Sequence, residues 1–259
     1  MKTVLICHHD DPLNREGMAR WLGSFSDLGG VVVIREEGNR MRARIRREIK
    51  RIGFVRFLDV LAFRLYYKLR LAAKDGVVER ALLHEIASRF PPSQARELIT
   101  ASPNSAESRQ FIRDAAPDIM IARCKTLLAE RIFSIPRVGT FVMHPGICPE
   151  YRNAHGCFWA LAERDLSRVG MTLLRIDKGV DTGPVFGYFS YPYDERNESH
   201  MIIQHRVVFD NLDAIRQKLE EIYQGTAATI STAGRKSAVW GQPWLTRYLA
   251  WKRAAAGSQ

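Results

Sequence analysis

Apolar and polar positions alternate along the start of the chain in a way that predicts strands and helices in turn. Short β-branched runs occupy residues 3–7 and 30–34, and such runs are typical of buried strands. Between them, residues 14–25 carry apolar side chains at the three- and four-residue spacing of an amphipathic helix. Strand, helix and strand joined by short links predict a parallel α/β sheet.

The same alternation resumes after residue 104. We expect strands over 118–124, 138–144, 170–177 and 184–191, and helices over 105–117, 127–136, 157–165 and 199–225. The predicted fold is therefore one α/β domain over residues 1–225 with a mostly parallel sheet.

A helical insertion is predicted at about residues 40–90. Apolar residues recur every three or four positions within it, at Phe54, Phe57, Leu58, Leu61, Leu65, Leu69 and Ala72. Charged side chains are spread through the same stretch, so it is not expected to span a membrane, although it can lie on a membrane surface. Packing against the protein's own sheet or against a second subunit is the other interpretation, which leaves a homodimer open. Residues 226–259 are expected to form a basic, partly ordered tail.

Length and charge narrow the class of protein. The 259 residues suit one large domain, and 46% of them are hydrophobic, enough for a sizeable core. The net charge is +11, and between Arg40 and Arg80 there are 13 Lys or Arg against 4 Asp or Glu. Such a block attracts nucleic acid, an anionic membrane or phosphorylated substrates, or is simply a solvated helix surface. Nucleic acid is not expected as a partner, because no aromatic-interleaved basic sheet or reading helix accompanies the charge.

The cysteines and the N-terminus favour a cytoplasmic protein. The four cysteines form no C-x-x-C pair, and the apolar run at residues 3–7 is too short for a signal peptide. We therefore expect reduced thiols in the cytoplasm. A metal site is not expected at residues 7–11, because His8 and His9 are adjacent and no second cluster supports them.

Two residues are candidates for a proton-handling pair. His144 is placed at the carboxyl end of the predicted strand 138–144, and Asp181 in the loop after the strand 170–177. Reactive groups collect at such strand ends in open α/β sheets, and a carboxylate beside an imidazole raises its basicity and fixes its orientation. By spacing alone the signal is weak, because a lone histidine after a strand is usually structural and Asp-Thr-Gly-Pro is a common turn.

The order of several short motifs resembles the N10-formyltetrahydrofolate-dependent formyltransferases, which act on glycinamide ribonucleotide, methionyl-tRNA or nucleotide sugars. The matching motifs are Pro117-Asp118, Leu127-Leu128, Val142-Met143-His144-Pro145, Cys148-Pro149-Glu150-Tyr151-Arg152-Asn153, Gly170-Met171-Thr172 and Asp181-Thr182-Gly183-Pro184. The resemblance covers about residues 104–186 and implies a Rossmann-like formyltransferase domain. The stretch from Tyr151 to Leu161 looks most like the branch acting on sugars or other small metabolites.

The resemblance implies roles for particular residues. His144 would assist the oxyanion formed when an amine attacks the formyl group, and Asp181 would hold His144 and relay protons. The formyl donor, N10-formyltetrahydrofolate, would lie among Thr126, Leu127, Leu128, Ile176, Asp177 and Val180. The acceptor, a small-molecule amine such as a nucleotide-linked amino sugar, would face His8, His9 and Arg152.

One position departs from the family pattern. The family has an asparagine two residues before the histidine, and this chain has Val142. The loss of one oxyanion donor typically costs a factor of about 10²–10³ in rate. Asn153 and His155 are the nearest candidates for a substitute donor. The alternatives are a catalytically altered or inactive binding protein, or a formyltetrahydrofolate hydrolase in which water replaces the amine.

Overall fold

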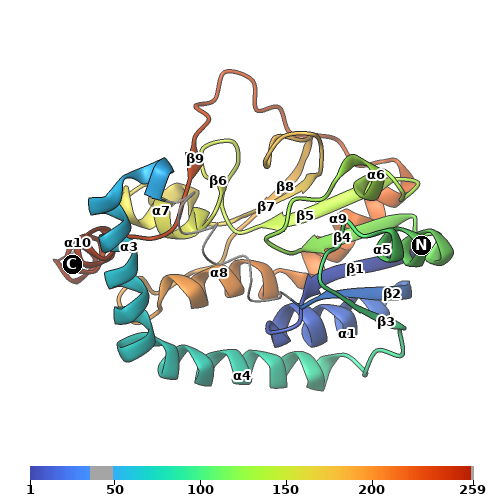
Figure 1. Cartoon of the computed structure of the whole chain (residues 1–259), viewed down its shortest axis with the longest axis horizontal. Helices are drawn as coiled ribbons and strands as arrows, with labels where there is room; N and C mark the ends of the chain where they lie inside the picture. Colours follow the sequence, from blue (N-terminus) through green and yellow to red (C-terminus); the bar gives the residue numbers. More distant parts are fainter. Residues whose placement is uncertain (36–48, 258–259) are drawn as a thin grey trace.

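The computed structural model describes residues 1–35 and 49–257. Within them a seven-stranded sheet has the order β3-β2-β1-β4-β5-β7-β8. The strands are β1 (Lys2–His8), β2 (Asp27–Ile34), β3 (Glu97–Thr100), β4 (Ile119–Arg123), β5 (Gly139–His144), β7 (Met171–Arg175) and β8 (Val185–Phe189). β1 to β5 pair with one another in parallel, whereas β7 pairs antiparallel with both β5 and β8. The predicted mostly parallel α/β sheet is confirmed (Figure 1).

Helices cover both faces of the sheet, because alternate side chains of each buried strand point to opposite sides. On β1, Leu5 and Cys7 join one core cluster and Val4 and Ile6 the other. The larger cluster includes residues of α1 (Met18–Gly23), α7 (Gly156–Ala162), α8 (His200–Phe209) and α9 (Leu212–Gln224). The smaller one includes residues of α5 (Ala106–Ala115) and α6 (Glu130–Phe133). Two short helical turns, η1 (Leu13–Gly17) and η4 (Leu166–Arg168), complete these layers.

The predicted insertion is helical over its described part. It consists of α3 (Phe54–Tyr66), the turn η3 (Tyr67–Leu71) and α4 (Ala72–Arg89), and its predicted start at 40–48 lies outside the described residues. The inner side of α3 packs on the domain: the Phe63 ring lies 5.9 Å from Phe158 and 5.3 Å from Tyr248. Among the described residues no helix is long and apolar enough to cross a membrane.

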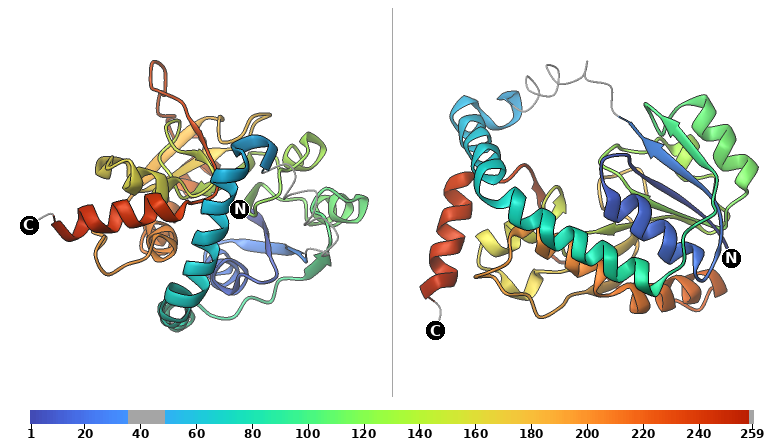
Figure 2. Two further views of the ribbon diagram at one scale, coloured as in Figure 1. Left: turned by 60° about the vertical axis from the view of Figure 1, so that its left-hand side comes forward. Right: turned by 90° about the horizontal axis from the view of Figure 1, so that it is seen from below.

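The C-terminal segment differs from the expected partly ordered tail. β9 (Val239–Trp240) pairs with β6 (Arg152–Asn153), and α10 (Leu245–Gly257) buries Tyr248, Trp251 and Ala255. α10 lies beside α3 at one end of the molecule (Figures 1 and 2). The aromatic residues of this segment supply the apolar area that holds it in place.

Candidate active site

The structure brings His144 and Asp181 together. His144 ends β5 and is 4% exposed, and its Nδ1 lies 3.5 Å from Oδ2 of Asp181, which comes from the loop between β7 and β8. The predicted pair thus exists as a contact, at the carboxyl edge of the parallel strands where α/β sheets place their reactive groups.

The hydrogen bond made by Nε2 of His144 determines which protonation states allow a hydrogen bond between Nδ1 and Asp181. Nε2 lies 2.7 Å from the carbonyl oxygen of Tyr151, and a carbonyl only accepts, so Nε2 carries a proton. In a neutral ring Nδ1 would then present a lone pair to the carboxylate. A hydrogen bond to Asp181 therefore forms when the ring is an imidazolium, or when the carboxyl group holds the proton instead.

Small residues and one threonine hold His144 in this position. A Cβ on Gly146 would lie 2.6 Å from the Tyr151 carbonyl oxygen and 2.7 Å from His144 Nε2, so only glycine fits there. The Thr172 hydroxyl donates to the Gly146 carbonyl at 2.6 Å and accepts from the Cys148 N–H at 2.9 Å. The Gly-x-Thr motif therefore supports the turn that follows His144.

The loop that carries Asp181 is also held by close backbone approaches and hydrogen bonds. Asp181 has a φ of +51°, a left-handed conformation that Asp tolerates better than most residues. A Cβ on Gly183 would lie 1.9 Å from the Arg175 carbonyl oxygen. Asp177 accepts from the Gly179 N–H at 2.9 Å and from the Thr182 hydroxyl at 2.7 Å. Asp177, predicted to bind the cofactor, thus has its Oδ1 atom engaged in shaping this loop.

The Tyr-Arg-Asn turn is tied to the Asp181 loop. Arg152 Nη1 donates to the Val180 carbonyl at 3.0 Å, and the backbone N–H of Asn153 donates to Asp181 Oδ2 at 2.7 Å. Arg152 Nε is buried without a partner. The Asn153 side-chain amide donates one hydrogen bond to the Trp240 carbonyl, which holds it against the C-terminal segment.

His155, the other candidate donor, faces a separate cavity. The cavity has a volume of about 160 Å³ and is lined by Val60, Phe63, Arg64, Tyr67, His155, His200, Met201, Gln242 and Pro243. Nδ1 of His155 and Nδ1 of His200 are buried and have no partner. Burial lowers the pKa of His155 to about 4, and it also lowers the pKa of His200. Both rings are therefore neutral near pH 7 and belong to a cavity between the insertion and the domain.

Val142 lies beside His144 on the same side of β5. The strand register places it between Ala122 of β4 and Leu174 of β7, and its position two residues before His144 gives it the same face. Its side chain offers no hydrogen-bond donor to this face.

The predicted donor-binding segment 126–128 is anchored by a residue that sequence reasoning did not select. The Asn104 side chain donates to the Leu127 carbonyl at 2.9 Å and accepts from the Ala129 N–H at 2.7 Å. The Leu127 side chain is 69% exposed. On the opposite loop, the Ile176 N–H donates to the Thr140 carbonyl at 2.7 Å. The side chain of Leu127 is thus free for an apolar ligand while its backbone is fixed.

The two predicted substrate-facing histidines make protein contacts. His8 Nε2 accepts from the Lys125 N–H at 3.0 Å, and His9 Nε2 lies 2.7 Å from Arg35 Nη2. His8 therefore joins the carboxyl end of β1 to the loop after β4. No group of three His, Cys, Asp or Glu side chains within residues 1–35 and 49–257 could hold a metal ion.

Sequence reasoning also missed a polar cluster at the ends of β4 and β5. Arg123 Nε donates to Asn14 at 2.6 Å, and its Nη1 donates to the Met143 carbonyl, next to His144. Asn14 in turn donates from its side chain to Asp11 at 2.6 Å. Burial lowers the pKa of Arg123, while Asp11 opposes that effect. An arginine near the end of a buried strand was the available signal for this cluster.

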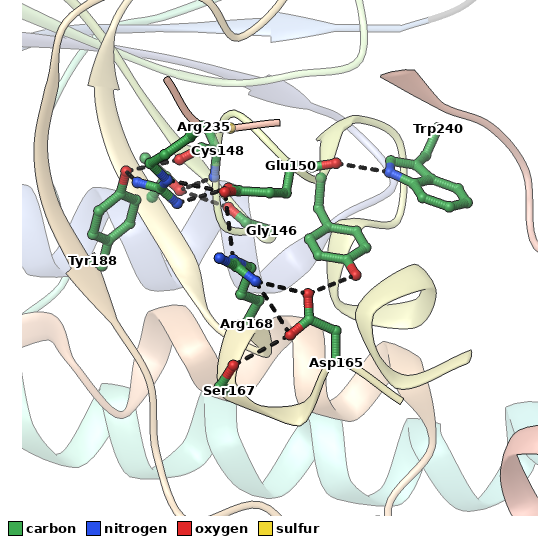
Figure 3. Close-up of polar contacts among 11 residues, drawn as sticks. Gly146, Cys148, Glu150, Asp165, Ser167, Arg168, Tyr188, Arg235 and Trp240 are labelled. Carbon is green, nitrogen blue, oxygen red and sulfur yellow. Dashed lines mark hydrogen bonds and ion pairs between the residues drawn. The ribbon is translucent and has the colours of Figure 1, made fainter. Parts of the chain in front are cut away.

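Side chains of the C-terminal segment contact the turn that follows His144. Arg235 reaches Glu150 and Tyr188, and Trp240 Nε1 donates to the Glu150 carbonyl at 2.9 Å (Figure 3). The Trp240 ring also stacks on Tyr151 with centroids 5.7 Å apart. The turn whose Tyr151 carbonyl holds His144 is therefore clamped by residues more than 80 positions downstream.

Known proteins are similar to this chain in sequence and in fold. A family model described as formyl transferase matches residues 71–218, more than half of the chain. Methionyl-tRNA formyltransferase of Thermotoga maritima is 35% identical over 83 residues, which cover 32% of this chain and 26% of that protein. The corresponding Bacteroides thetaiotaomicron protein is 29% identical over 112 residues, 41% of this chain and 34% of that one. The chain thus aligns with roughly a quarter to a third of these curated relatives.

Solved structures share the fold over a longer range. Phosphoribosylglycinamide formyltransferase from Anaplasma phagocytophilum superposes with a TM-score of 0.56 at 12% identity, over 92% of this chain and 97% of that one. A sugar N-formyltransferase from Shewanella sp FDAARGOS_354 gives 0.55 at 12% identity, over 98% and 88%. The predicted Rossmann-like formyltransferase fold is confirmed by these likenesses.

Proposed function

Because this chain belongs to the formyl transferase family, we propose that it moves a formyl group from N10-formyltetrahydrofolate to the amine of a small metabolite. The contact between His144 Nδ1 and Asp181 Oδ2 at 3.5 Å carries the proposal. It is an oriented pair of proton-handling groups at the edge of the sheet where the resemblance expects one.

In the proposed reaction, the amine nitrogen attacks the formyl carbon and the bond between that carbon and N10 then breaks. The amine loses a proton and N10 gains one, so no external oxidant or base is consumed. Asp181 is the group that takes the amine proton, directly or through water. The imidazolium of His144 offsets the negative charge that develops on the formyl oxygen. No covalent bond to the protein is needed.

The donor would bind along the segment anchored by Asn104. In this proposal Leu127 and Leu128 would cover a flat pterin ring, with Ile176 and Val180 on the loop of Asp181. Support comes from the exposed side chain of Leu127 next to a fixed backbone, whereas Leu128 is partly buried against the smaller core cluster. Thr126 and Asp177 contribute to the shape of these two loops.

The acceptor is proposed to be a small amine, with a nucleotide-linked amino sugar as the first choice. The full-length likeness to a sugar N-formyltransferase supports this choice, as does the sequence from Tyr151 to Leu161. The relatives described as methionyl-tRNA formyltransferases match over a much smaller share of their length, which gives less support to a tRNA acceptor.

A second function, binding without fast transfer, is favoured by two observations. Val142 supplies no amide to the formyl oxygen, and both ring nitrogens of His144 face protein groups, Asp181 and the Tyr151 carbonyl. A chain of this kind would bind folate while transferring slowly.

The experiment that separates these functions is the release of tetrahydrofolate from N10-formyltetrahydrofolate, followed by absorbance. The purified chain is assayed alone and with a panel of nucleotide-linked amino sugars, and folate binding is measured by calorimetry. Release that requires an amine supports the transferase. Binding without release supports the slow binding protein, and amine-independent release identifies a hydrolase. Absence of both binding and release would overturn the proposal.

A further inference from the structure

The helix α3 and the turn η3 carry a row of exposed apolar side chains on their outer side. We call Phe54, Leu58, Leu61, Leu65 and Leu69 the α3 stripe; each is between 41% and 69% exposed. Their spacing of three or four residues places them on one side of a helix. With Val55, they make up six of the twelve large exposed hydrophobic residues among the described residues. Isolated exposed apolar residues are normal, whereas a contiguous group marks an interaction surface.

The α3 stripe is not the side by which the helix packs on the domain. That role belongs to Phe57, Val60 and Phe63, which are all buried. The helix is fixed further by Asp59, whose carboxylate accepts from the Thr246 backbone N–H at 3.1 Å. The views in Figure 2 place α3 at the end of the molecule beside α10. The outer side is thus presented on a helix that is already anchored.

The charges around the stripe have one sign. Arg64, Lys68 and Arg70 are exposed, whereas the acids of this stretch are engaged elsewhere. Asp59 binds Thr246, and Asp75 is buried and accepts from the Ser199 hydroxyl at 2.6 Å. The fully exposed charged side chains between residues 54 and 75 are therefore all cations.

This charge pattern favours a lipid surface over a second copy of the chain as the partner of the α3 stripe. Most dimers are two-fold symmetric, so a second copy would bring the same cations against one another. An anionic lipid surface offers the opposite charge at its headgroups and an apolar layer just beneath them. A helix with an apolar row flanked by Lys and Arg is typical of segments that lie in the plane of such a surface.

We propose that the α3 stripe docks this protein on the surface of an anionic lipid bilayer. The leucines enter the headgroup boundary, and Arg64, Lys68 and Arg70 meet the lipid phosphates. This inference concerns a surface separate from the His144–Asp181 pair and does not depend on the proposed reaction.

Flotation of the full-length chain with lipid vesicles tests the proposal. Vesicles of phosphatidylcholine alone are compared with vesicles containing 30 mol% phosphatidylglycerol. Binding to the anionic vesicles should be about tenfold stronger or more and should weaken as salt screens the charges. Leu65→Glu/Leu69→Glu should reduce it by about tenfold or more, because both leucines leave water on docking. Lys68→Glu/Arg70→Glu should abolish the preference for anionic lipid.

Val77→Glu on α4 is the matched control, since Val77 is 59% exposed but lies outside the stripe. It should bind like the unchanged chain, and all variants should unfold at the same temperature. Equal binding to both kinds of vesicle, or none, would overturn the proposal. Light scattering gives a second test. If it shows a dimer that Leu65→Glu/Leu69→Glu converts to a monomer, the stripe is a subunit contact and the proposal is overturned.

Discussion

Arg235 and Glu150, which lie 85 positions apart in the chain, form a two-pronged ion pair with N···O distances of 2.9 and 2.6 Å. Glu150 is only 8% exposed, and Arg168 Nε lies 3.4 Å from its Oε1 as a second, longer contact. The pair fastens the C-terminal segment to the turn that orients His144.

Arg235→Ala should lower the free energy of unfolding by about 1–3 kcal/mol, because it leaves a buried carboxylate with only its longer contact to Arg168, at 3.4 Å. Denaturant unfolding measures the loss. Arg235→Ala/Glu150→Gln should recover part of it, since the buried charge is then removed. Lys236→Ala, at the neighbouring exposed position, should have little effect. An Arg235→Ala protein as stable as the original would show that the pair contributes nothing.

Asp181→Asn should abolish formyl transfer while the fold is retained. The amide accepts no proton and cannot pair with an imidazolium, so we expect a loss of about 10²-fold or more in kcat. Tetrahydrofolate release measures the rate, and circular dichroism checks the fold. Turnover at the original rate in this variant would remove Asp181 from the proton path.

Val142→Asn should raise folate-dependent turnover by about 10-fold or more if the remaining machinery is intact, because it adds a donor beside His144. Val142→Thr, with a similar volume but no amide, is the comparison. A fall in turnover with Asn, or equal rates for both variants, would mean that the space beside Val142 has been rebuilt for a different ligand.

Gly183→Ala should destabilise the protein by about 2 kcal/mol or more, since its Cβ would lie 1.9 Å from the Arg175 carbonyl oxygen and the loop would have to move. Gly76→Ala serves as the control, because Gly76 lies within α4 and a Cβ there meets only the end of the Arg80 side chain at 3.4 Å. The control should gain about 0.5–1 kcal/mol from helix propensity. Thermal unfolding of both variants decides the matter, and a neutral Gly183→Ala would show that the loop yields easily.

Acid should destabilise the protein through the two buried histidines. Burial lowers the pKa of His155 to about 4 and lowers that of His200 as well, whereas an unfolded histidine titrates near 6.5. Below about pH 6.5 the unfolded chain therefore binds protons that the folded chain does not. We expect a loss of about 1–2 kcal/mol per histidine between pH 7 and pH 5.

Unfolding in denaturant at several pH values measures this slope. His200→Phe, in an aromatic surrounding of Phe63 and Phe158, should remove the contribution of His200 and flatten the slope. A slope that is the same in the variant would mean that other groups cause the acid sensitivity.

The strands and most helices could be predicted because their apolar periods are long enough to read. β3 was missed, since Glu97–Thr100 has four residues, only one of them buried, and no clear alternation. The single helix expected over 199–225 is two helices, with Asp210 and Asn211 between α8 and α9. Apolar periodicity continues across that break, so the pattern alone conceals it.

The candidate site was only partly visible in the sequence. His144 and Asp181 were selected through the motifs that resemble the formyltransferase family, because their positions after predicted strands left a structural histidine and an ordinary turn open. The partner of His144 Nε2 is a main-chain carbonyl of Tyr151, and any residue type supplies a carbonyl. Trp240 and Arg235 reach the site through long-range packing, which no local pattern reports. His155 looked like a site residue from its position, but its backbone directs it into the neighbouring cavity.

Because β6 pairs with β9, the turn after His144 is braced by a strand that is synthesised much later than the turn itself. A ribosome that has translated the family-matched segment, residues 71–218, has released His144, Asp181 and the whole turn, yet the strand that braces this turn is still unmade. The turn that orients His144 can therefore be braced by β9 only once residue 240 has been made. By then every strand of the central sheet has been translated, since the last of them along the chain, β8, ends at Phe189.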